Sequence, residues 1–213
     1  MYIAFEGPIG AGKTTLARLM ADELSPNVQT LLEGFERNPF LSDFYKDQAR
    51  WALPMQLTFL LERRRQLGKL VPGARNLIAD HSLLKEKVFA PLVLQEDELA
   101  LYIRLSEELT TTCAGPDLFV FLNASTEELL RRIAARGRTY ETAIDADYLD
   151  RLRAAYEVEF AKHEDHHVLR LDTSAIDLSD EAQLKDLWNQ ILTGALSGAE
   201  TSTAIADVAT DPV

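Results

Sequence analysis

The sequence of 213 residues contains a single cysteine, Cys113. One thiol excludes an internal disulfide framework and any metal site built from several cysteines. A lone cysteine is typical of a protein from a reducing compartment, where it is usually buried as small core filler, so we expect a cytoplasmic protein. No apolar run approaches the roughly 20 residues that span a bilayer. The N-terminus opens directly into a strand-like run, so we also expect no signal peptide.

Basic residues are scarce: 22 Lys and Arg stand against 34 Asp and Glu, for a formal charge of −12. A chain this acidic is poorly suited to wrapping nucleic acid or docking on anionic membrane, so we expect neither partner. Its arginines nevertheless cluster at residues 63–65 and 131–138. With 46% hydrophobic residues, the chain can bury one well-developed core with a small lid.

Near the N-terminus, an apolar run is followed by the pattern G-x-x-x-x-G-K-T and then by a helix-like segment. This context predicts a phosphate-binding loop in which backbone N–H groups and a helix N-terminus hold phosphate oxygens. Lys13 should reach the β- and γ-phosphates of ATP, and the Thr14 hydroxyl should ligate Mg²⁺. The alternative is a glycine-rich turn that binds nothing. The expected nucleotide-binding residues are Gly7, Pro8, Ile9, Gly10, Ala11, Gly12, Lys13, Thr14 and Thr15.

Short apolar runs alternate with helical patterns along the chain. This alternation predicts an α/β fold: a five-stranded parallel sheet with helices on both faces, of the P-loop NTPase type. The expected strands are 2–5, 28–32, 76–79, 118–122 and 167–171. The expected helices are 13–24, 41–67 with an interruption at Pro54, 96–110, one ending near Gly137, 147–162 and 180–192. A turn is expected at 71–73, one domain over 1–195, and a disordered tail over 196–213.

Two helices carry more specific expectations. In the segment 96–110, Leu99, Tyr102, Ile103 and Leu109 share one face, which predicts that this face is buried. The helix that ends near Gly137 should begin with a capping box, because Ser125 is followed by Glu128.

Two predicted strands are followed by carboxylates, Glu33 after the second and Asp80 after the third. Carboxyl ends of parallel strands share one edge of the sheet, so both acids should lie beside the phosphate-binding loop. A phosphoryl-transfer enzyme needs one acid to hold Mg²⁺ and another to orient or deprotonate the attacking hydroxyl. The alternative for each acid is a helix cap or a solvated turn.

Arg132, Arg136 and Arg138 surround Gly137 at the end of a helix. We interpret residues 132–143 as a lid hinged at the glycine, which closes guanidinium donors over the transferring phosphate. The alternative is a solvated basic helix end, which the helix dipole also favours.

From Tyr2 to about Leu171 the sequence resembles the deoxyribonucleoside kinases, and in particular the bacterial branch acting on deoxyadenosine and deoxyguanosine. The resemblance is carried by GPIGAGKTT, the Glu33 strand end, NPFLSDFY, RWALPMQLTFLLERRRQ, the Asp80 strand end, PDLFVFL and RIAARGRTYE. It implies an ATP-dependent kinase of deoxyribonucleosides, with a purine favoured, that uses Mg²⁺ and forms a homodimer through helix faces.

The resemblance also implies roles for individual residues. Glu33 takes the proton from the sugar 5′-hydroxyl, Tyr45 and Glu141 hold the 3′-hydroxyl, and Gln56 pairs with the base near Arg63. Asp80 keeps the metal-linked acid. The lid arginines are Arg132, Arg136 and Arg138, and the residues expected to shape the pocket are Phe35, Met55 and Phe89.

One triplet departs from the family pattern. Better-known members carry an arginine after the third-strand acid, whereas this chain has Asp80-His81-Ser82. A histidine is mostly neutral near pH 7 unless it is perturbed. Some bacterial relatives use a later lysine instead, so Lys85 is the candidate replacement; the alternative is an exposed helix lysine, like Lys87. Glu86 lies near the position of an acid that would partner Arg63.

Two other functions compete with this one. A nucleoside monophosphate kinase of the thymidylate-kinase type would share the fold and lid but commonly needs an Asp-Arg pair after the third strand, and Asp80-His81 lacks it. A P-loop signalling switch would need an N-K-x-D element that reads guanine, and the sequence contains none.

Overall fold

The computed structural model describes residues 1–24, 28–69, 76–162 and 167–197. These residues contain one sheet of five strands, all parallel, in the order β2-β3-β1-β4-β5. The strands are β1 Tyr2–Glu6, β2 Val28–Leu31, β3 Asn76–Ala79, β4 Leu118–Asn123 and β5 His167–Asp172. The predicted α/β fold with five parallel strands is confirmed.

The central strands are buried on both sides. All five residues of β1 and the first five of β4 are buried, as expected for a parallel sheet covered on both faces. The register pairs Ile3 with Ile78 and Ala4 with Phe119. Because all the strands run the same way, the loops that follow them meet at one edge of the sheet.

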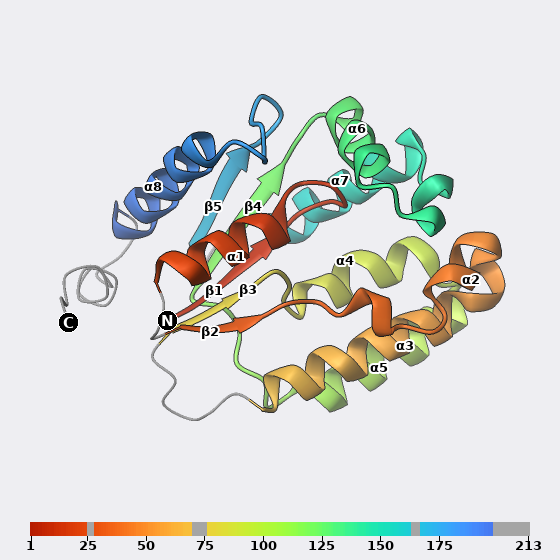
Figure 1. Cartoon of the computed structure of the whole chain (residues 1–213). Helices are drawn as coiled ribbons and strands as arrows, with labels where there is room; N and C mark the ends of the chain where they lie inside the picture. The colour runs from red at the N-terminus through yellow and green to blue at the C-terminus, as the bar shows by residue number, and fades with distance from the viewer. Residues whose placement is uncertain (25–27, 70–75, 163–166, 198–213) are drawn as a thin grey trace.

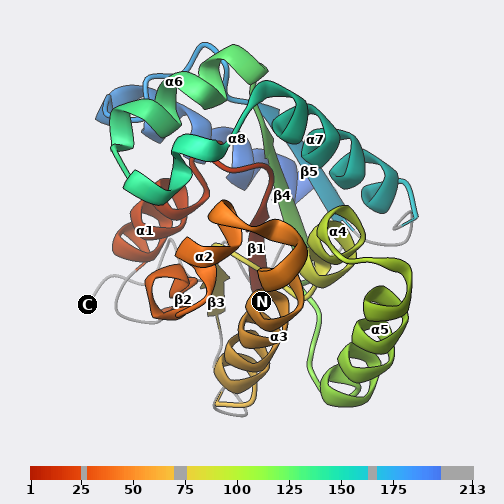
Figure 2. The ribbon, with the colours of Figure 1, turned by 90° about the vertical axis from the view of Figure 1, so that its right-hand side faces the viewer.

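Helices cover both faces of the sheet (Figures 1 and 2). Helices α1 and α8 pack together on one face, and α3, α4, α5 and α7 lie on the other. The helices are α1 Lys13–Glu23, α2 Leu41–Lys46, α3 Gln48–Leu67, α4 Leu84–Val93, α5 Glu96–Thr110, α6 Thr126–Arg136, α7 Ala146–Phe160 and α8 Glu181–Ser197. Two short 3₁₀ turns, η1 Phe35–Arg37 and η2 Thr139–Ala143, complete the described elements.

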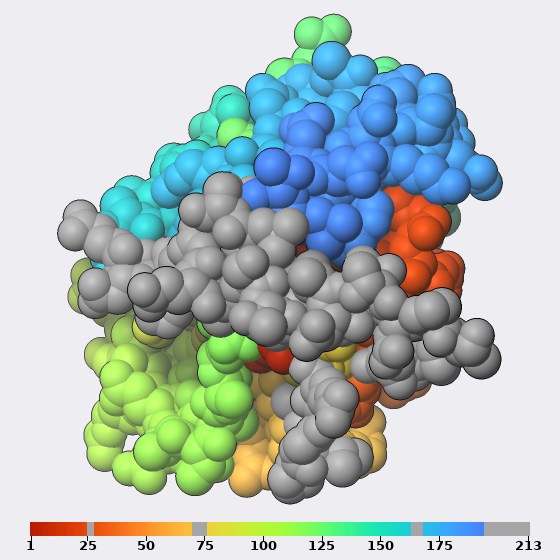
Figure 3. All heavy atoms as spheres, turned by 90° about the vertical axis from the view of Figure 1, so that its left-hand side faces the viewer, coloured from red at the N-terminus to blue at the C-terminus, as the bar shows by residue number. Residues whose placement is uncertain are grey.

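The described residues form two apolar cores. The larger one surrounds the sheet, and the smaller one joins α2, α3, α4 and α5 around Phe44, Met55, Leu60 and Tyr102. Residues of both α2 and α3 in or beside the small core, among them Phe44 and Met55, also line the cavity described below. Figure 3 shows the side of the molecule away from that cavity, with β5 and α8 in blue above and the end of α5 in light green below. None of the described helices is long and apolar enough to cross a membrane.

The interruption predicted at Pro54 is wrong. Helix α3 runs through this proline, and the break falls earlier, at Asp47, whose side chain accepts a hydrogen bond from the Arg50 N–H at 3.2 Å. A proline inside a helix frees the carbonyl four residues before it. That carbonyl belongs to Arg50, which is exposed to water. Packing of α3 on the small core then outweighs the lost hydrogen bond.

Three other expectations need correction, and one helix was missed. Ile103 is 45% exposed, so the buried face of α5 is narrower than its pattern suggests and centres on Tyr102. The Ser125 side chain accepts from the Glu128 N–H at 3.2 Å, but the Glu128 carboxylate pairs with arginines and not with the cap, so only half of the capping box forms. Cys113 packs against the larger core but is only half-buried. Helix α4 was not predicted at all.

At the C-terminal end, α8 extends through Ser197, so residues 196 and 197 are helical and the predicted tail begins too early. The rest of that tail and the turn at 71–73 lie outside the described residues.

Candidate active site

A cavity of about 700 Å³ opens at the carboxyl edge of the sheet. Most residues selected from the sequence line it. They are Ile9, Gly10, Lys13, Thr14, Thr15, Glu33, Phe35, Tyr45, Met55, Gln56, Arg63, Asp80, Lys85, Phe89, Arg136, Arg138 and Glu141. Of the remaining selections, Gly12 and Arg132 line a smaller adjoining hollow of about 350 Å³. Residues separated by more than a hundred positions in the sequence therefore face one space.

The phosphate-binding loop joins β1 to α1 by a backbone path that needs glycine. Gly7 has φ +141°, and a Cβ there would lie 2.1 Å from the backbone oxygen of Leu122. The Lys13 ammonium donates to the backbone oxygens of Gly7 at 2.7 Å and Pro8 at 2.8 Å. Burial, followed by the charge of Lys85, lowers the pKa of Lys13 to about 7. An anion in the loop would restore the charged form of this lysine.

The carboxylate of Asp80 accepts two hydrogen bonds that link the residues around it. The Thr14 hydroxyl donates to Asp80 Oδ2 at 2.6 Å, and the Glu33 backbone N–H donates to Asp80 Oδ1 at 2.7 Å. Asp80 is 3% exposed. Its carboxylate thus fixes the start of α1 to the end of β2, which places the Glu33 side chain over the cavity.

Glu33 lies between two buried cations. Its Oε1 accepts from Arg63 Nη2 at 2.5 Å and Nε at 2.9 Å, and its Oε2 accepts from Lys85 Nζ at 2.6 Å. Burial by itself raises the pKa of Glu33, but the charges of Arg63 and Lys85 outweigh burial and hold this pKa well below its usual range. Lys85 is 4% exposed, so the alternative of an exposed lysine is wrong.

His81 lies beside this group as a neutral imidazole. It is fully buried, and burial lowers the pKa of His81 to about 4. Its Nε2 lies 2.7 Å from Gln66 Oε1, and the Gln66 amide donates to the backbone oxygen of Leu32 at 3.2 Å. A neutral imidazole cannot replace the charge of an arginine, so Lys85 is the cation that contacts Glu33 from this side.

Helices α3 and α4 form the deep end of the cavity. Gln56 is 1% exposed, and its Oε1 has no hydrogen-bond partner among the described residues. Arg63 Nη1 donates to Glu86 Oε1 at 2.7 Å, so Glu86 does partner Arg63. Phe59, which the sequence analysis missed, also lines this end. It lies one helical turn from both Met55 and Arg63, a spacing that could have identified it.

The opposite wall comes from α2 and η2. Tyr45 stacks on Tyr140 with ring centroids 6.0 Å apart. Glu141 is buried and accepts from Arg136 at 2.7 Å and Arg138 at 3.3 Å. The Arg138 guanidinium lies 3.8 Å from the centre of the Phe35 ring. Two of the three predicted lid arginines therefore face the cavity.

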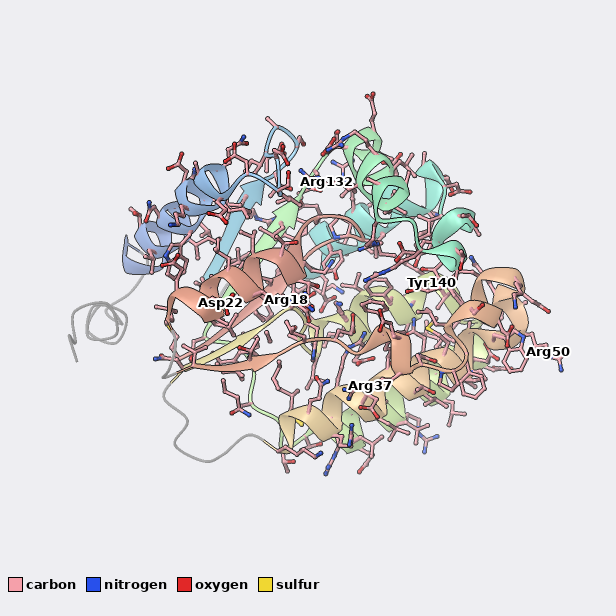
Figure 4. All side chains as sticks on the ribbon, in the orientation of Figure 1. Arg18, Asp22, Arg37, Arg50, Arg132 and Tyr140 are labelled. Carbon is pink, nitrogen blue, oxygen red and sulfur yellow. The ribbon has the colours of Figure 1, made fainter. Side chains whose placement is uncertain are left out.

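Arg132 lies elsewhere. It donates to Thr173 and to the backbone oxygen of Ile176 at 2.9 Å, which ties α6 to the loop after β5. Figure 4 shows it above α1, with Tyr140 on the turn below and Arg18 and Arg37 near the middle of the molecule. Arg132 lines the smaller hollow, beside the phosphate-binding loop. The sequence missed Arg18 and Arg37, which line the larger cavity.

Within the described residues no group of three or more His, Cys, Asp or Glu side chains can hold a metal ion. The Thr14 hydroxyl and the Asp80 carboxylate are nevertheless oxygen donors of the kind Mg²⁺ prefers. Magnesium usually takes one or two protein ligands and completes its shell with phosphates and water. This donor pair therefore fits a nucleotide-bound Mg²⁺.

Comparison with known proteins agrees with the site. A family model described as deoxynucleoside kinase matches residues 3–194. The chain belongs to the deoxynucleoside kinase family. Among relatives of this family, a deoxyguanosine kinase of Bacillus subtilis (strain 168) is 35% identical over 162 residues, which cover 74% of this chain and 77% of the relative. A deoxyadenosine kinase of Dictyostelium discoideum is 31% identical over 191 residues, which cover 87% of this chain and 77% of the relative.

A solved structure of a deoxynucleoside kinase has the same fold as this chain. The deoxyadenosine kinase from M. mycoides, with the products dCMP and a flexible dCDP bound, superposes with a TM-score of 0.77 at 26% identity. The match covers 91% of this chain and 99% of that one.

Proposed function

We propose that the protein transfers the γ-phosphate of ATP to the 5′-hydroxyl of a purine deoxyribonucleoside, giving the monophosphate and ADP. The observation that carries this proposal is the position of Glu33. Its carboxylate lines the same cavity as residues of the phosphate-binding loop and as Gln56 and Arg63, which supports this role. A carboxylate in that cavity suits a hydroxyl that attacks a phosphate held by the loop.

Glu33 is proposed to accept the proton of the 5′-hydroxyl. The hydroxyl oxygen bonds to the γ-phosphorus, the bond from that phosphorus to the β–γ bridging oxygen breaks, and ADP leaves. Arg63 and Lys85 keep the carboxylate ionised because their charges lower the pKa of Glu33. In a loose transition state the attacking oxygen needs orientation more than a strong base.

Charge on the moving phosphoryl group is proposed to be balanced by Lys13, Arg136 and Arg138, which face the cavity. The two arginines are now held by Glu141. A mobile η2 would bring them to the phosphate. Thr14 and Asp80 would hold Mg²⁺, which would supply positive charge near the phosphates when bound.

The remaining contacts are proposed to select the two substrates. Tyr45 and Glu141 suit the sugar 3′-hydroxyl, and Gln56 with Arg63 suits the base, with Phe35, Met55 and Phe89 shaping its pocket. The smaller hollow suits the rest of the ATP molecule. Arg132, residues 177–179 and the start of α1 line this hollow together.

The thymidylate-kinase alternative gains no support. The position after Asp80 is a buried neutral histidine and not an arginine that would bind an acceptor phosphate. Relatives found by comparison are named as kinases of deoxynucleosides.

The test is a Glu33→Gln variant assayed with Mg²⁺-ATP and purine deoxynucleosides. We expect turnover to fall by about 10²–10⁴-fold, the usual contribution of a positioned general base. ATP binding, measured by calorimetry, should change little. Glu62→Gln, on the exposed side of α3, is the matched control. Retained turnover would remove Glu33 from this role, and no product from any deoxynucleoside with the native protein would refute the proposed function.

We also propose that the protein is a cytoplasmic homodimer that pairs through helix faces. Leu101 and Leu105, one turn apart on α5, are 49% and 37% exposed. Light scattering should give twice the chain mass, and Leu101→Glu should lower it. A monomeric native protein would contradict this proposal.

A further inference from the structure

The deep end of the cavity contains a guanidinium whose hydrogen bonds are only partly used. Three of the five Arg63 N–H groups donate to the carboxylates of Glu33 and Glu86. The other two N–H groups have no acceptor among the described residues, and they belong to a side chain that is 4% exposed and lines the cavity. Since these groups can only donate, they favour a ligand atom that accepts.

The neighbouring carboxylate, that of Glu86, does not line the cavity. Glu86 Oε1 binds Arg63 at 2.7 Å, and its Oε2 accepts the hydroxyl of Tyr102 from α5. Tyr102 is 1% exposed and belongs to the small core. Lys85 and Phe89 on the same helix line the cavity, whereas Glu86 is not among its lining residues. The tyrosine thus holds this carboxylate away from the ligand space.

What remains at this end is the Arg63 donor pair and the Gln56 amide, which offers one acceptor and two donors. Guanine presents two neighbouring acceptors, O6 and N7, which match a guanidinium. Adenine presents its 6-amino group in place of O6, and two donors facing each other repel. With guanine on Arg63, the partnerless Gln56 Oε1 can accept from the N1–H edge.

We propose that Tyr102, by holding Glu86 against Arg63, makes the acceptor site prefer a 6-oxopurine over a 6-aminopurine. This inference rests on the proposed function, because it concerns the acceptor base of the same site. Tyr102 touches no substrate and acts through Glu86, so it is a positioning residue for specificity.

The first test uses the native protein with Mg²⁺-ATP and four deoxyribosides: those of guanine, hypoxanthine, adenine and 2,6-diaminopurine. We expect kcat/KM for the two 6-oxo bases to exceed that for the two 6-amino bases by about tenfold. If adenine and diaminopurine are used as well or better, this inference is overturned while the proposed function stands. If none of the four is phosphorylated, the proposed function fails and this inference falls with it.

The second test is Tyr102→Phe, which keeps the buried ring and removes the hydroxyl. The freed Glu86 oxygen can then accept from a 6-amino group, so we expect the ratio of kcat/KM for deoxyguanosine to that for deoxyadenosine to fall about fivefold. Tyr2→Phe removes another buried hydroxyl, whose 3.4 Å contact to the His81 backbone oxygen lies away from the base, and should leave the ratio unchanged. If Tyr102→Phe lowers kcat/KM equally for deoxyguanosine and deoxyadenosine, the tyrosine has only a structural role and the proposal is overturned. If the variant does not fold, the native series decides.

Discussion

The two ends of the cavity are built in different ways. The phosphate end comes from one continuous stretch, Gly7 to Thr15, whose shape depends on local backbone conformation. The acceptor end comes from side chains far apart in the sequence, with Glu33, Arg63 and Lys85 joined by ion pairs. A change in backbone shape should therefore impair the phosphate end. The acceptor end depends instead on the balance between buried positive and negative charges.

Among the variants that compare the two ends, Lys13→Met should have the largest effect, because it removes the lysine of the phosphate-binding loop. We expect kcat/KM to fall by about 10³-fold, the usual cost of losing one group that stabilises transition-state charge. Deoxynucleoside binding, measured by calorimetry without ATP, should stay close to that of the native protein. A loss of kcat/KM without a loss of deoxynucleoside binding would show that the two ends act separately.

The matched control is Lys46→Met, because Lys46 lies on the surface of α2 in an exposed pair with Asp43. Its kcat/KM should change less than twofold, as expected for an exposed ion pair. Equal loss of nucleoside binding and turnover in Lys13→Met would contradict the separation.

Gly7→Ala tests the backbone of the phosphate end directly. A methyl group there would meet the Leu122 oxygen at 2.1 Å, in a residue with φ +141°. Combined overpacking and backbone strain should lower the free energy of unfolding by about 3 kcal/mol. Gly137→Ala is the control, since its φ is +69° but no atom lies within 4 Å of the added carbon. It should cost about 1 kcal/mol. Urea unfolding of both variants measures the difference, and equal costs would refute the steric argument.

Lys85→Met tests the charge balance of the acceptor end. Without this cation the pKa of Glu33 should rise, because Lys85 is one of the two charges that hold it down. We expect kcat to fall by about 10- to 100-fold and the acid limb of the pH–rate profile to move to higher pH.

Lys87→Met, two residues further along α4, is the control for Lys85→Met. Its ammonium is exposed and 3.9 Å from Glu159. Its acid limb, measured by kinetics that extend below pH 5, should stay in place because the pKa of Glu33 remains low. An unmoved acid limb in Lys85→Met would show that Arg63 alone sets the ionisation of Glu33.

The difference between the two ends also explains how much the sequence could predict. The strands and the loop from Gly7 to Thr15 are local patterns, and the structure has them close to where they were expected. Helix α4 was missed because Pro91 and a mixed pattern hide its period. The continuity of α3 through Pro54 depends on the small core, a tertiary feature that no local signal contains.

Charge partners were harder to predict than positions. A strand end selected Glu33, and the resemblance to the deoxyribonucleoside kinases selected Arg63 and Lys85. Which Glu33 oxygen each cation binds follows from the way α3 and α4 pack. The role of Tyr102 was invisible for the same reason. Its place on an apolar face of α5 predicts a buried ring and not a hydroxyl that binds Glu86.

The smallest predicted effect concerns His81, which lies between the two ends. Burial lowers its pKa to about 4, from the ordinary value of 6.5. Between these values the unfolded chain binds more protons than the folded one, so stability falls as the pH falls from 6.5 towards 4. His81→Asn removes this group. From pH 7.5 to 5, the native protein should therefore lose about 1–2 kcal/mol more unfolding free energy than the variant. The measurement is urea unfolding of both proteins at each pH. If both lose the same unfolding free energy from pH 7.5 to 5, the imidazole titrates normally. The acceptor end would then tolerate one more buried charge than its packing suggests.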